Sequence, residues 1–360
     1  MAGFADLGGW PGVLTRLLAG RSLRTDEAQC VMAEVLAGNA TPAQIAALAV
    51  SLRAKGETVE EITGLVAGML AAAQPLRVEA DAIDLVGTGG DRLSSINVTT
   101  LAAFVAAGAG TKVCKHGGRA ASSSVGTADV LEALGVAVDL GPTGVARCVA
   151  EVGMGFCLAT RYHPAMRHAG PVRRELGIPT VFNFLGPLAN PARVTRQLVG
   201  VSDPVMAPKM AAVLGANGSR RAMVVFADDG LDEISLSAPT TVLDLTGDGS
   251  GSFEVCTVRF DPAEVGLPSA DLEDVRGGDA GFNAAVIRRV LQGERSARRD
   301  IGVLNAAAAL VVSGAAAEMA TGVALAEASI DEGRALSVLD ELVRVSQEAA
   351  AAQADASSTT

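Results

Sequence analysis

The stretch "AIDLVGTGGDRLSSINVTTLAAFVAAGAGTKVCKHGG", residues 82–118, decides the fold. An apolar segment runs into a glycine-rich turn, an alanine-rich helix follows, and a second apolar segment ends in another glycine pair. This order predicts a strand, a helix and a second strand, which is the repeating unit of a parallel sheet. In such sheets, ligands bind at the carboxyl ends of the strands, where both glycine-rich loops are expected to lie.

The same pattern continues along the chain. Further strands are predicted within residues 153–159, 196–203, 220–230 and 253–260. Because helical segments separate most of them, we predict an α/β domain with a largely parallel central sheet and helices on its faces. The segment after residue 278 is again expected to be helical.

The first 75 residues are expected to form a small helical domain. Helix starts are indicated at Thr25, at Thr41-Pro42 and at Thr58, where Glu61 completes a capping box. We therefore divide the chain into a small helical domain (1–75), joined by helices from about 165–190, an α/β domain (76–350) and a disordered tail (351–360).

Composition limits the possible partners. The chain has 360 residues and a formal net charge of −11, which argues against nucleic acid or an anionic membrane as a ligand. No apolar segment is long enough to span a bilayer, no signal peptide is evident, and the five cysteines are scattered. A soluble, cytoplasmic protein with reduced thiols is the expectation.

The loop "GTGGDRLSSINVTT", residues 87–100, is suited to binding an anion. Its glycines allow backbone N–H groups to converge, and the helix expected from about Thr99 adds the positive end of its dipole. Side-chain donors follow at Ser95, Asn97, Thr99 and Thr100. The loop matches neither a Walker A motif nor a dinucleotide fingerprint, and an ordinary tight turn is the alternative.

The next loop, "KHGGRAASSS" at residues 115–124, repeats this arrangement with Lys115, Arg119 and three serines. Charge and hydroxyl groups of this kind bind phosphate. A solvated basic loop is the alternative. Together, the two loops predict a ligand with two separated phosphate groups.

Two further segments carry candidate ligand groups. Asp228, Asp229, Asp232 and Glu233 form an acidic cluster after a strand, which suits Mg²⁺ but equally a surface turn. In residues 161–191, His163, Arg167 and Arg173 are candidates to face a cleft, where arginine would match a carboxylate. His168 is expected to pack between helices.

Taken in order, these motifs resemble the anthranilate phosphoribosyltransferase family up to about residue 345. The carriers are "GTGGD", "NVTT", "KHGGRAASS", "HPAMRHAGPVRRELG", "NFLGPLANP" and "DGLDE". The resemblance implies a nucleoside-phosphorylase-like fold, usually a homodimer, that transfers the phosphoribosyl group of phosphoribosyl pyrophosphate (PRPP) to the amine of anthranilate in tryptophan biosynthesis.

The resemblance also implies site residues. It places PRPP on Gly87, Gly90, Asp91, Ser95, Asn97, Val98, Thr99, Thr100, Lys115, His116, Gly117, Arg119, Ser122, Ser123 and Thr127. Mg²⁺ is expected on Thr99, Asp232 and Glu233, and the acceptor on Gly87, Gly118, His163 and Arg173. We expect no catalytic nucleophile or base, because an aryl amine is neutral at pH 7.

Several positions depart from the family pattern. Gly118 stands where the family has an asparagine that binds anthranilate, Arg92 replaces a glycine, and Phe226-Ala227 replaces His-Gly. Thr99 replaces serine and keeps the hydroxyl. A transferase acting on a different or substituted aryl carboxylate in secondary metabolism is therefore an alternative. A nucleoside phosphorylase and a non-catalytic nucleic-acid-binding relative are less favoured.

Overall fold

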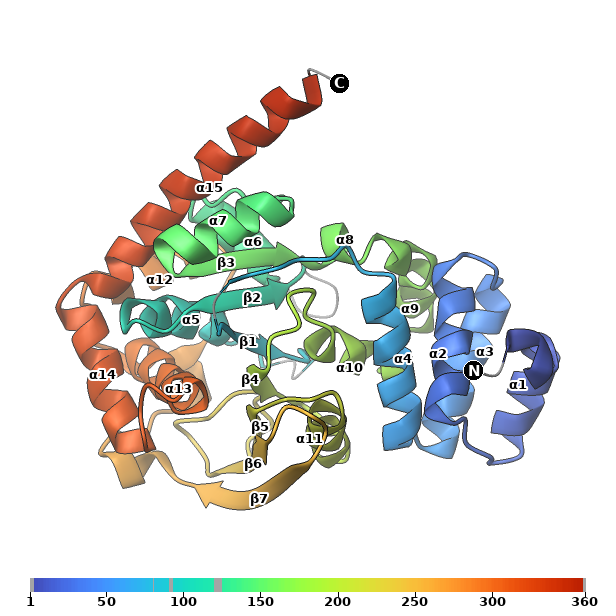
Figure 1. The fold of residues 1–360 in the computed structure, drawn as a ribbon. Coiled ribbons are helices and arrows are strands. Elements are labelled where there is room, and N and C mark those ends of the chain that lie inside the picture. Colours follow the sequence, from blue (N-terminus) through green and yellow to red (C-terminus); the bar gives the residue numbers. More distant parts are fainter. Residues whose placement is uncertain (1–2, 80, 91–92, 120–124, 359–360) are drawn as a thin grey trace.

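The protein combines a seven-stranded sheet, covered by helices, with a group of helices at one side (Figure 1). The computed structural model describes residues 3–79, 81–90, 93–119 and 125–358. Asp91, Arg92, Ser122 and Ser123, which the sequence places at the site or among its departures, lie outside these residues. Among the helices that the structure describes, none is long and apolar enough to cross a membrane.

The strands lie in the order β3-β2-β1-β4-β5-β6-β7. They are β1 (Ile83–Gly87), β2 (Val113–Gly117), β3 (Met154–Leu158), β4 (Arg196–Gly200), β5 (Arg221–Ala227), β6 (Thr240–Gly247) and β7 (Phe253–Phe260). The first five run parallel, and β6 and β7 are antiparallel to their neighbours. The predicted strands are confirmed, whereas β6 was not predicted.

The strand order reverses between β1 and β4, which pair in parallel so that Gly87 lies level with Gly200. From β1 the chain passes to β2 and β3 on one side, and it then returns to form β4 on the other. At such a switch point the loops leaving two adjacent strands diverge, and a ligand can enter between them.

Helices precede, separate and follow the strands. They are α1 (Gly9–Leu18), α2 (Thr25–Leu36), α3 (Pro42–Lys55), α4 (Val59–Ala71), α5 (Val98–Gly108), α6 (Thr127–Ala133), α7 (Pro142–Val152), α8 (Ala159–Tyr162), α9 (Gly170–Leu176), α10 (Val181–Leu188), α11 (Ala207–Ala216), α12 (Ala280–Leu291), α13 (Ala297–Ser313), α14 (Met319–Asp331) and α15 (Arg334–Ser358). Short 3₁₀ turns cover Phe4–Leu7, Pro164–His168, Pro262–Val265 and Leu272–Val275.

The N-terminal helices begin where their caps predict. The Thr41 hydroxyl accepts from the Gln44 N–H at 3.3 Å, and Thr58 and Glu61 form the predicted reciprocal pair at 2.9 and 3.2 Å. Each cap satisfies N–H groups that the helix leaves without partners. The interval between α4 and β1 contains the predicted boundary near residue 75.

Two apolar cores hold the molecule together. One lies between the sheet and helices that include α5, α7, α13 and α15. The other is continuous from the N-terminal helices through α9, α10 and α11 to the opposite side of the sheet. His168 packs against Gly38 of the N-terminal helices, which agrees with its predicted packing role. Because the second core is shared, the helical group is joined to the sheet through buried apolar contacts.

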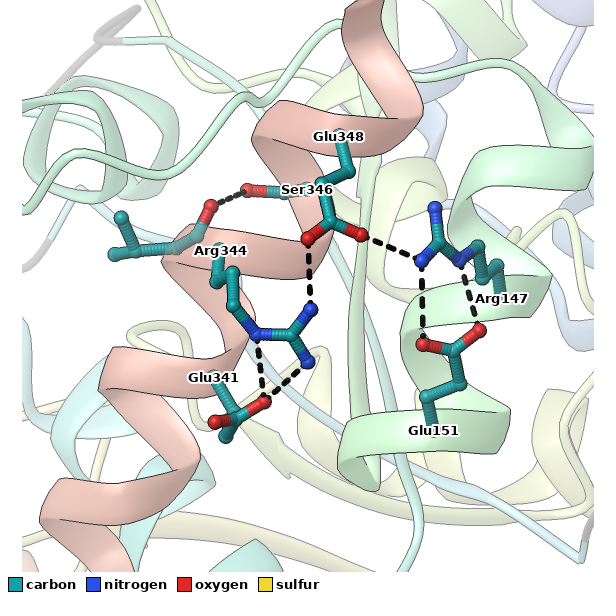
Figure 2. A network of polar contacts seen from close by, with 7 residues as sticks. Arg147, Glu151, Glu341, Arg344, Ser346 and Glu348 are labelled. Carbon is teal, nitrogen blue, oxygen red and sulfur yellow. Dashed lines mark hydrogen bonds and ion pairs between the residues drawn. The ribbon is translucent and has the colours of Figure 1, made fainter. Parts of the chain in front are cut away.

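The C-terminal helix corrects one prediction. Residues 351–358 continue α15, so a disordered tail from residue 351 is wrong for these residues. Alanine favours the helix there, and the Gln353 side chain accepts from the Gly141 N–H at 2.7 Å. Figure 2 shows an earlier part of α15 joined to α7, where Glu348 accepts from both Arg344 and Arg147 at 2.7 Å.

Candidate active site

A cleft of about 880 Å³ opens at the carboxyl ends of β1, β2 and β3. The predicted residues that line it are Gly87, Gly90, Ser95, Asn97, Thr99, Lys115, His116, Gly117, Gly118, Arg119, Thr127, His163, Arg173, Asp232 and Glu233. Val98 and Thr100 lie behind it, buried in the first turn of α5. The N-terminal helical group contributes Met69, so the cleft lies between that group and the sheet.

The first glycine-rich loop fits closely against the acidic turn. Gly89 and Gly90 have φ values of 63° and 85°, which favour glycine, and the Gly89 N–H donates to Asp232 Oδ2 at 2.7 Å. A β-carbon on Gly87 would lie 2.7 Å from that oxygen, and one on Gly200 would lie 1.5 Å from the Asp232 carbonyl oxygen. Glycine at both strand ends therefore allows Asp232 to reach the cleft.

Lys115 connects the two loops beneath the cleft. Its side chain is almost fully buried, and its ammonium group donates to the Leu85 carbonyl and, at 3.2 Å, to the Thr99 hydroxyl. Burial lowers the pKa of Lys115 to about 8, against the opposing effects of Asp84 and Glu233. The lysine therefore carries a positive charge at neutral pH directly beneath both glycine-rich loops.

A buried carboxylate fixes the end of β2, and the sequence did not indicate it. Asp84 accepts from the His116 N–H at 3.0 Å and from the Asn190 amide at 2.9 Å. Asn190 also donates to the Cys114 carbonyl at 2.9 Å. Burial raises the pKa of Asp84 to about 6, while Lys115 and these hydrogen bonds oppose the rise. Asp84 and Asn190 thereby hold the backbone on both sides of Lys115.

The two cleft histidines are buried and neutral at pH 7. Burial lowers the pKa of His116 to about 3, and it also lowers the pKa of His163. The His116 Nδ1 atom contacts the Gly186 carbonyl oxygen at 3.2 Å, and the His163 Nε2 atom contacts the Ala189 carbonyl oxygen at 2.9 Å. Their ring centroids are 5.2 Å apart. Two buried, neutral imidazole rings can shape the cleft and form hydrogen bonds there, but they are poorly suited to take up a proton.

The two predicted arginines differ in their contacts. Arg119 donates to both oxygens of Glu132 at 2.6 Å and to Asp129 at 3.3 Å, and these carboxylates raise its pKa. Arg173, half-buried, makes no ion pair within the part of the chain that the structure describes, and burial lowers its pKa. A half-buried guanidinium in a cleft favours an anionic ligand such as a carboxylate.

The acidic cluster divides into two pairs, which corrects the prediction of one compact site. Asp228 forms an ion pair with Arg259, and Asp229 accepts from the Ser235 and Ser237 hydroxyls. Asp232 and Glu233, by contrast, are buried and line the cleft. Asp228 and Asp229 lie in the turn from Ala227 to Leu231, which a backbone hydrogen bond of 3.1 Å closes, whereas Asp232 and Glu233 follow this turn.

The oxygen donors that the described residues place in the cleft are too few to coordinate a metal ion on their own, and they suit Mg²⁺, which shares its coordination with water and substrate. Asp232, Glu233 and the Thr99 hydroxyl line the same cleft. Among the described residues, no cluster of three or more His, Cys, Asp or Glu side chains could hold a metal ion. Mg²⁺ usually takes one or two carboxylates and completes its shell with water and substrate phosphates.

Of the departures from the family pattern, Thr99, which keeps the hydroxyl, and Gly118 lie on the described lining of the cleft. Among the described residues, a β-carbon on Gly118 would meet only the Ala159 methyl group, at 3.8 Å, which is an ordinary contact. Its backbone is also outside the positive-φ region. Phe226 instead packs against the second core, and Ala227 is buried at the end of β5. A larger side chain would therefore fit at position 118 among the described residues.

Two buried asparagines from the C-terminal helices support the ligand loops, and the sequence did not indicate either. Asn283 of α12 donates to the Asn97 side chain at 2.9 Å. Asn305 of α13 accepts from the Ile234 N–H and donates to the Ile234 carbonyl, both at 3.0 Å. Ile234 directly follows Glu233, so Asn305 supports the segment that carries Asp232 and Glu233, in the way that Asn283 supports the glycine-rich loop of residues 87–100.

Comparison with known proteins gives consistent matches over most of the chain. Residues 79–336 match the glycosyl transferase family a/b domain, and residues 11–73 match the helical bundle domain of the same family. The anthranilate phosphoribosyltransferase of Thermomicrobium roseum is 51% identical over 95% of this chain and 98% of its own.

Solved structures show the same likeness. The anthranilate phosphoribosyltransferase of Thermus thermophilus is 41% identical with a TM-score of 0.86, covering 93% of this chain and 99% of its own. The Saccharomyces cerevisiae enzyme, in complex with PRPP and Mg, is 27% identical with a TM-score of 0.85, covering 94% of this chain and 98% of its own.

Proposed function

The chain belongs to the anthranilate phosphoribosyltransferase family, and from that premise we propose how its cleft works. It transfers the phosphoribosyl group of PRPP to the amine of anthranilate and releases diphosphate, a step of tryptophan biosynthesis. The observation that carries the proposal is the convergence, in one cleft, of two glycine-rich loops, a buried lysine and a carboxylate pair.

The donor half of the cleft is assigned to PRPP. Backbone N–H groups of the first loop and of the α5 N-terminus, with the side chains of Asn97 and Thr99, bind one phosphate portion. Lys115 and the loop that follows it bind the other. The remaining donor residues are those that the family resemblance names, from Gly87 to Thr127. Lys115 supplies a charge that is already desolvated, so its attraction to an anion is strong.

The metal site is assigned to Asp232, Glu233 and Thr99. When bound there, Mg²⁺ supplies positive charge next to the departing diphosphate. Asp232 is held in place by the Gly89 N–H at 2.7 Å, so the carboxylate is oriented before any ligand arrives. Asn305 holds the backbone that follows Glu233.

The reaction requires charge stabilisation and positioning more than proton transfer. The bond from C1 to the diphosphate oxygen breaks with its electron pair leaving on oxygen, and the amine lone pair forms the new bond from C1 to nitrogen. Lys115 and the loop N–H groups stabilise the departing anion. Arg173 binds the acceptor carboxylate, and Gly118 and His163 border the acceptor. The amine proton passes to solvent, because both cleft histidines have lowered pKa values.

A second acceptor is favoured by one observation. Gly118 leaves open a position where the family has an asparagine side chain, and a β-carbon added there would have the Ala159 methyl group as its nearest neighbour, at 3.8 Å. The space admits a substituent on the acceptor ring. A ring-substituted anthranilate or another aryl carboxylate is therefore the alternative acceptor.

The organisation around the site completes the proposal. Residues 1–75, with the helices of 165–190, form one domain and residues 76–350 the other, with the cleft between them. The protein acts as a homodimer in the cytoplasm. Exposed Leu18 and Val50 on α1 and α3 offer apolar surface to a second copy, and none of the five cysteines, all within the described residues, forms a disulfide. Light scattering after size exclusion measures the assembly.

Diphosphate release tests the assignment of donor and acceptor together. Purified protein, PRPP and Mg²⁺ are incubated with anthranilate, with ring-substituted anthranilates, with other aryl carboxylates, or without acceptor. We expect release that needs an acceptor and is fastest with anthranilate. Faster release with a substituted ring would establish the alternative acceptor, and release with none of them would contradict the proposal.

A further inference from the structure

The side-chain amide of Asn283 has a fixed orientation behind the glycine-rich loop of residues 87–100. The residue lies in the first turn of α12, its side chain is 2% exposed, and its Oδ1 atom accepts from the Gly278 N–H at 2.8 Å. A backbone N–H can only donate, so the amide oxygen of Asn283 must face Gly278. The NH₂ group of the same amide must then face the other way.

That orientation determines the orientation of a second amide. The Asn283 NH₂ group donates to Asn97 Oδ1 at 2.9 Å. With its oxygen turned toward Asn283, Asn97 has only its own NH₂ group left to present to the cleft that it lines. Within the described part of the chain this NH₂ group makes no hydrogen bond, so it is available to a ligand oxygen.

Backbone hydrogen bonds join the segment before Asn97 to the segment before Asn283. The Ile96 N–H donates to the Val275 carbonyl at 3.0 Å, and the Gly277 N–H donates to the Ser94 carbonyl at 2.8 Å. A β-carbon on Gly277 would lie 2.6 Å from the Ser95 carbonyl oxygen, so the two segments touch. The segment that precedes α12 is thus held against the loop of residues 87–100. The side-chain amides of Asn283 and Asn97 meet next to these backbone contacts.

We propose that Asn283 is a positioning residue for PRPP, acting through Asn97. The Gly278 N–H orients Asn283, Asn283 orients Asn97, and Asn97 thereby presents a hydrogen-bond donor and not an acceptor to the anionic ligand. The inference rests on the proposed function, because the ligand oxygen it requires is one of PRPP.

Asn283→Asp reverses this polarity with almost no change in shape. One carboxylate oxygen still accepts from Gly278, and the other faces Asn97, which must turn its NH₂ group away from the cleft. Asn97 then presents its oxygen to PRPP. We expect the KM for PRPP to rise roughly tenfold to a hundredfold, whereas Asn283→Ala, which leaves Asn97 able to rotate, should raise it only about threefold.

A purely structural role predicts the opposite order, because alanine loses both hydrogen bonds and leaves a cavity. Val286→Ala, at a fully buried position of the same helix, is the control for lost packing. It should lower the melting temperature and leave the KM for PRPP unchanged. If KM instead follows the melting temperature across the three variants, the inference is wrong.

A double-mutant cycle separates the effect of the added aspartate charge from the effect of reorienting Asn97. In an Asn97→Ala background, Asn283→Asp should cause no further rise in KM, because the residue through which it acts is gone. A penalty that persists there would assign the effect to charge alone and overturn the inference. Absence of PRPP turnover by the unmodified protein would contradict the proposed function, whereas normal turnover with an unchanged KM in Asn283→Asp would contradict only the inference.

Discussion

At the residue scale, the site depends on a few buried polar groups that hydrogen bonds hold in place. Lys115 provides the clearest case, because it donates to the Leu85 carbonyl and to Thr99 while Asp84 lies behind the same loop. A charge buried in this way needs compensation, and it is available to an anion only while the lysine stays protonated.

The first prediction follows from the lowered pKa of Lys115. The amine is charged below about pH 8 and loses its charge as pH rises through that value. Because kcat/KM reports the free enzyme, kcat/KM for PRPP should fall between pH 7 and pH 9. In Lys115→Met, kcat/KM should be low throughout and show no step in this range. A profile of the unmodified protein that stays flat to pH 9 would contradict this role for Lys115.

Gly118 gives the second prediction. An asparagine fits there, and one added hydrogen bond to anthranilate is worth about 1 kcal/mol. Gly118→Asn should therefore raise kcat/KM for anthranilate about fivefold and lower it for a ring-substituted acceptor that uses the space. Gly118→Ala, which adds only a methyl group, is the matched control. No gain in Gly118→Asn would show that this position does not tune the acceptor.

At the scale of elements, the loops and most strands could be predicted, because glycine runs, hydroxyl donors and apolar segments are visible locally. β6 was missed, since its segment "TTVLDLTG" pairs antiparallel with its neighbours and so falls outside the alternation of strands and helices on which the prediction relied. The tail was wrong because its small polar residues also permit a helix that packs on a distant segment, as Gln353 does on Gly141. The division of the acidic cluster likewise depends on Arg259, which lies on another strand.

The supporting asparagines could not be predicted for a related reason. Asn190 meets Asp84 across 106 positions of the chain, and Asn283 meets Asn97 across 186. Asparagine occurs in caps, turns and cores alike, so its identity alone does not reveal a partner that only the folded chain brings near. The sequence could therefore indicate the loops that line the cleft but not the helices that hold those loops.

Asn305 gives a prediction at this scale. Asn305→Ala removes hydrogen bonds to Ile234 and leaves its backbone groups without these partners, so the acidic turn should loosen. We expect the Mg²⁺ concentration for half-maximal rate to rise about tenfold and stability to fall by about 2 kcal/mol. Val303→Ala, buried on the same helix, should reduce stability without changing the Mg²⁺ requirement. Equal Mg²⁺ requirements in the two variants would contradict the assigned role.

At the scale of the whole molecule, the cleft lies at the carboxyl ends of β1, β2 and β3, where the helical group meets the sheet. In a chain of net charge −11, the groups that we propose to bind anions lie here, on loops that buried asparagines and glycine contacts support. The acidic surface does not attract the ligand, so binding depends on this local arrangement. The sequence predicted the location of the cleft through the parallel sheet, because strand ends of one sheet meet at one edge.

The fluorescence of anthranilate, followed in the presence of purified protein, PRPP and Mg²⁺, tests the central claim most directly. We predict a loss of fluorescence that requires PRPP, is abolished by chelating Mg²⁺ and is absent in Lys115→Met at low PRPP. Unchanged fluorescence at saturating PRPP and Mg²⁺, with protein shown to be folded, would contradict the assignment of anthranilate as the acceptor.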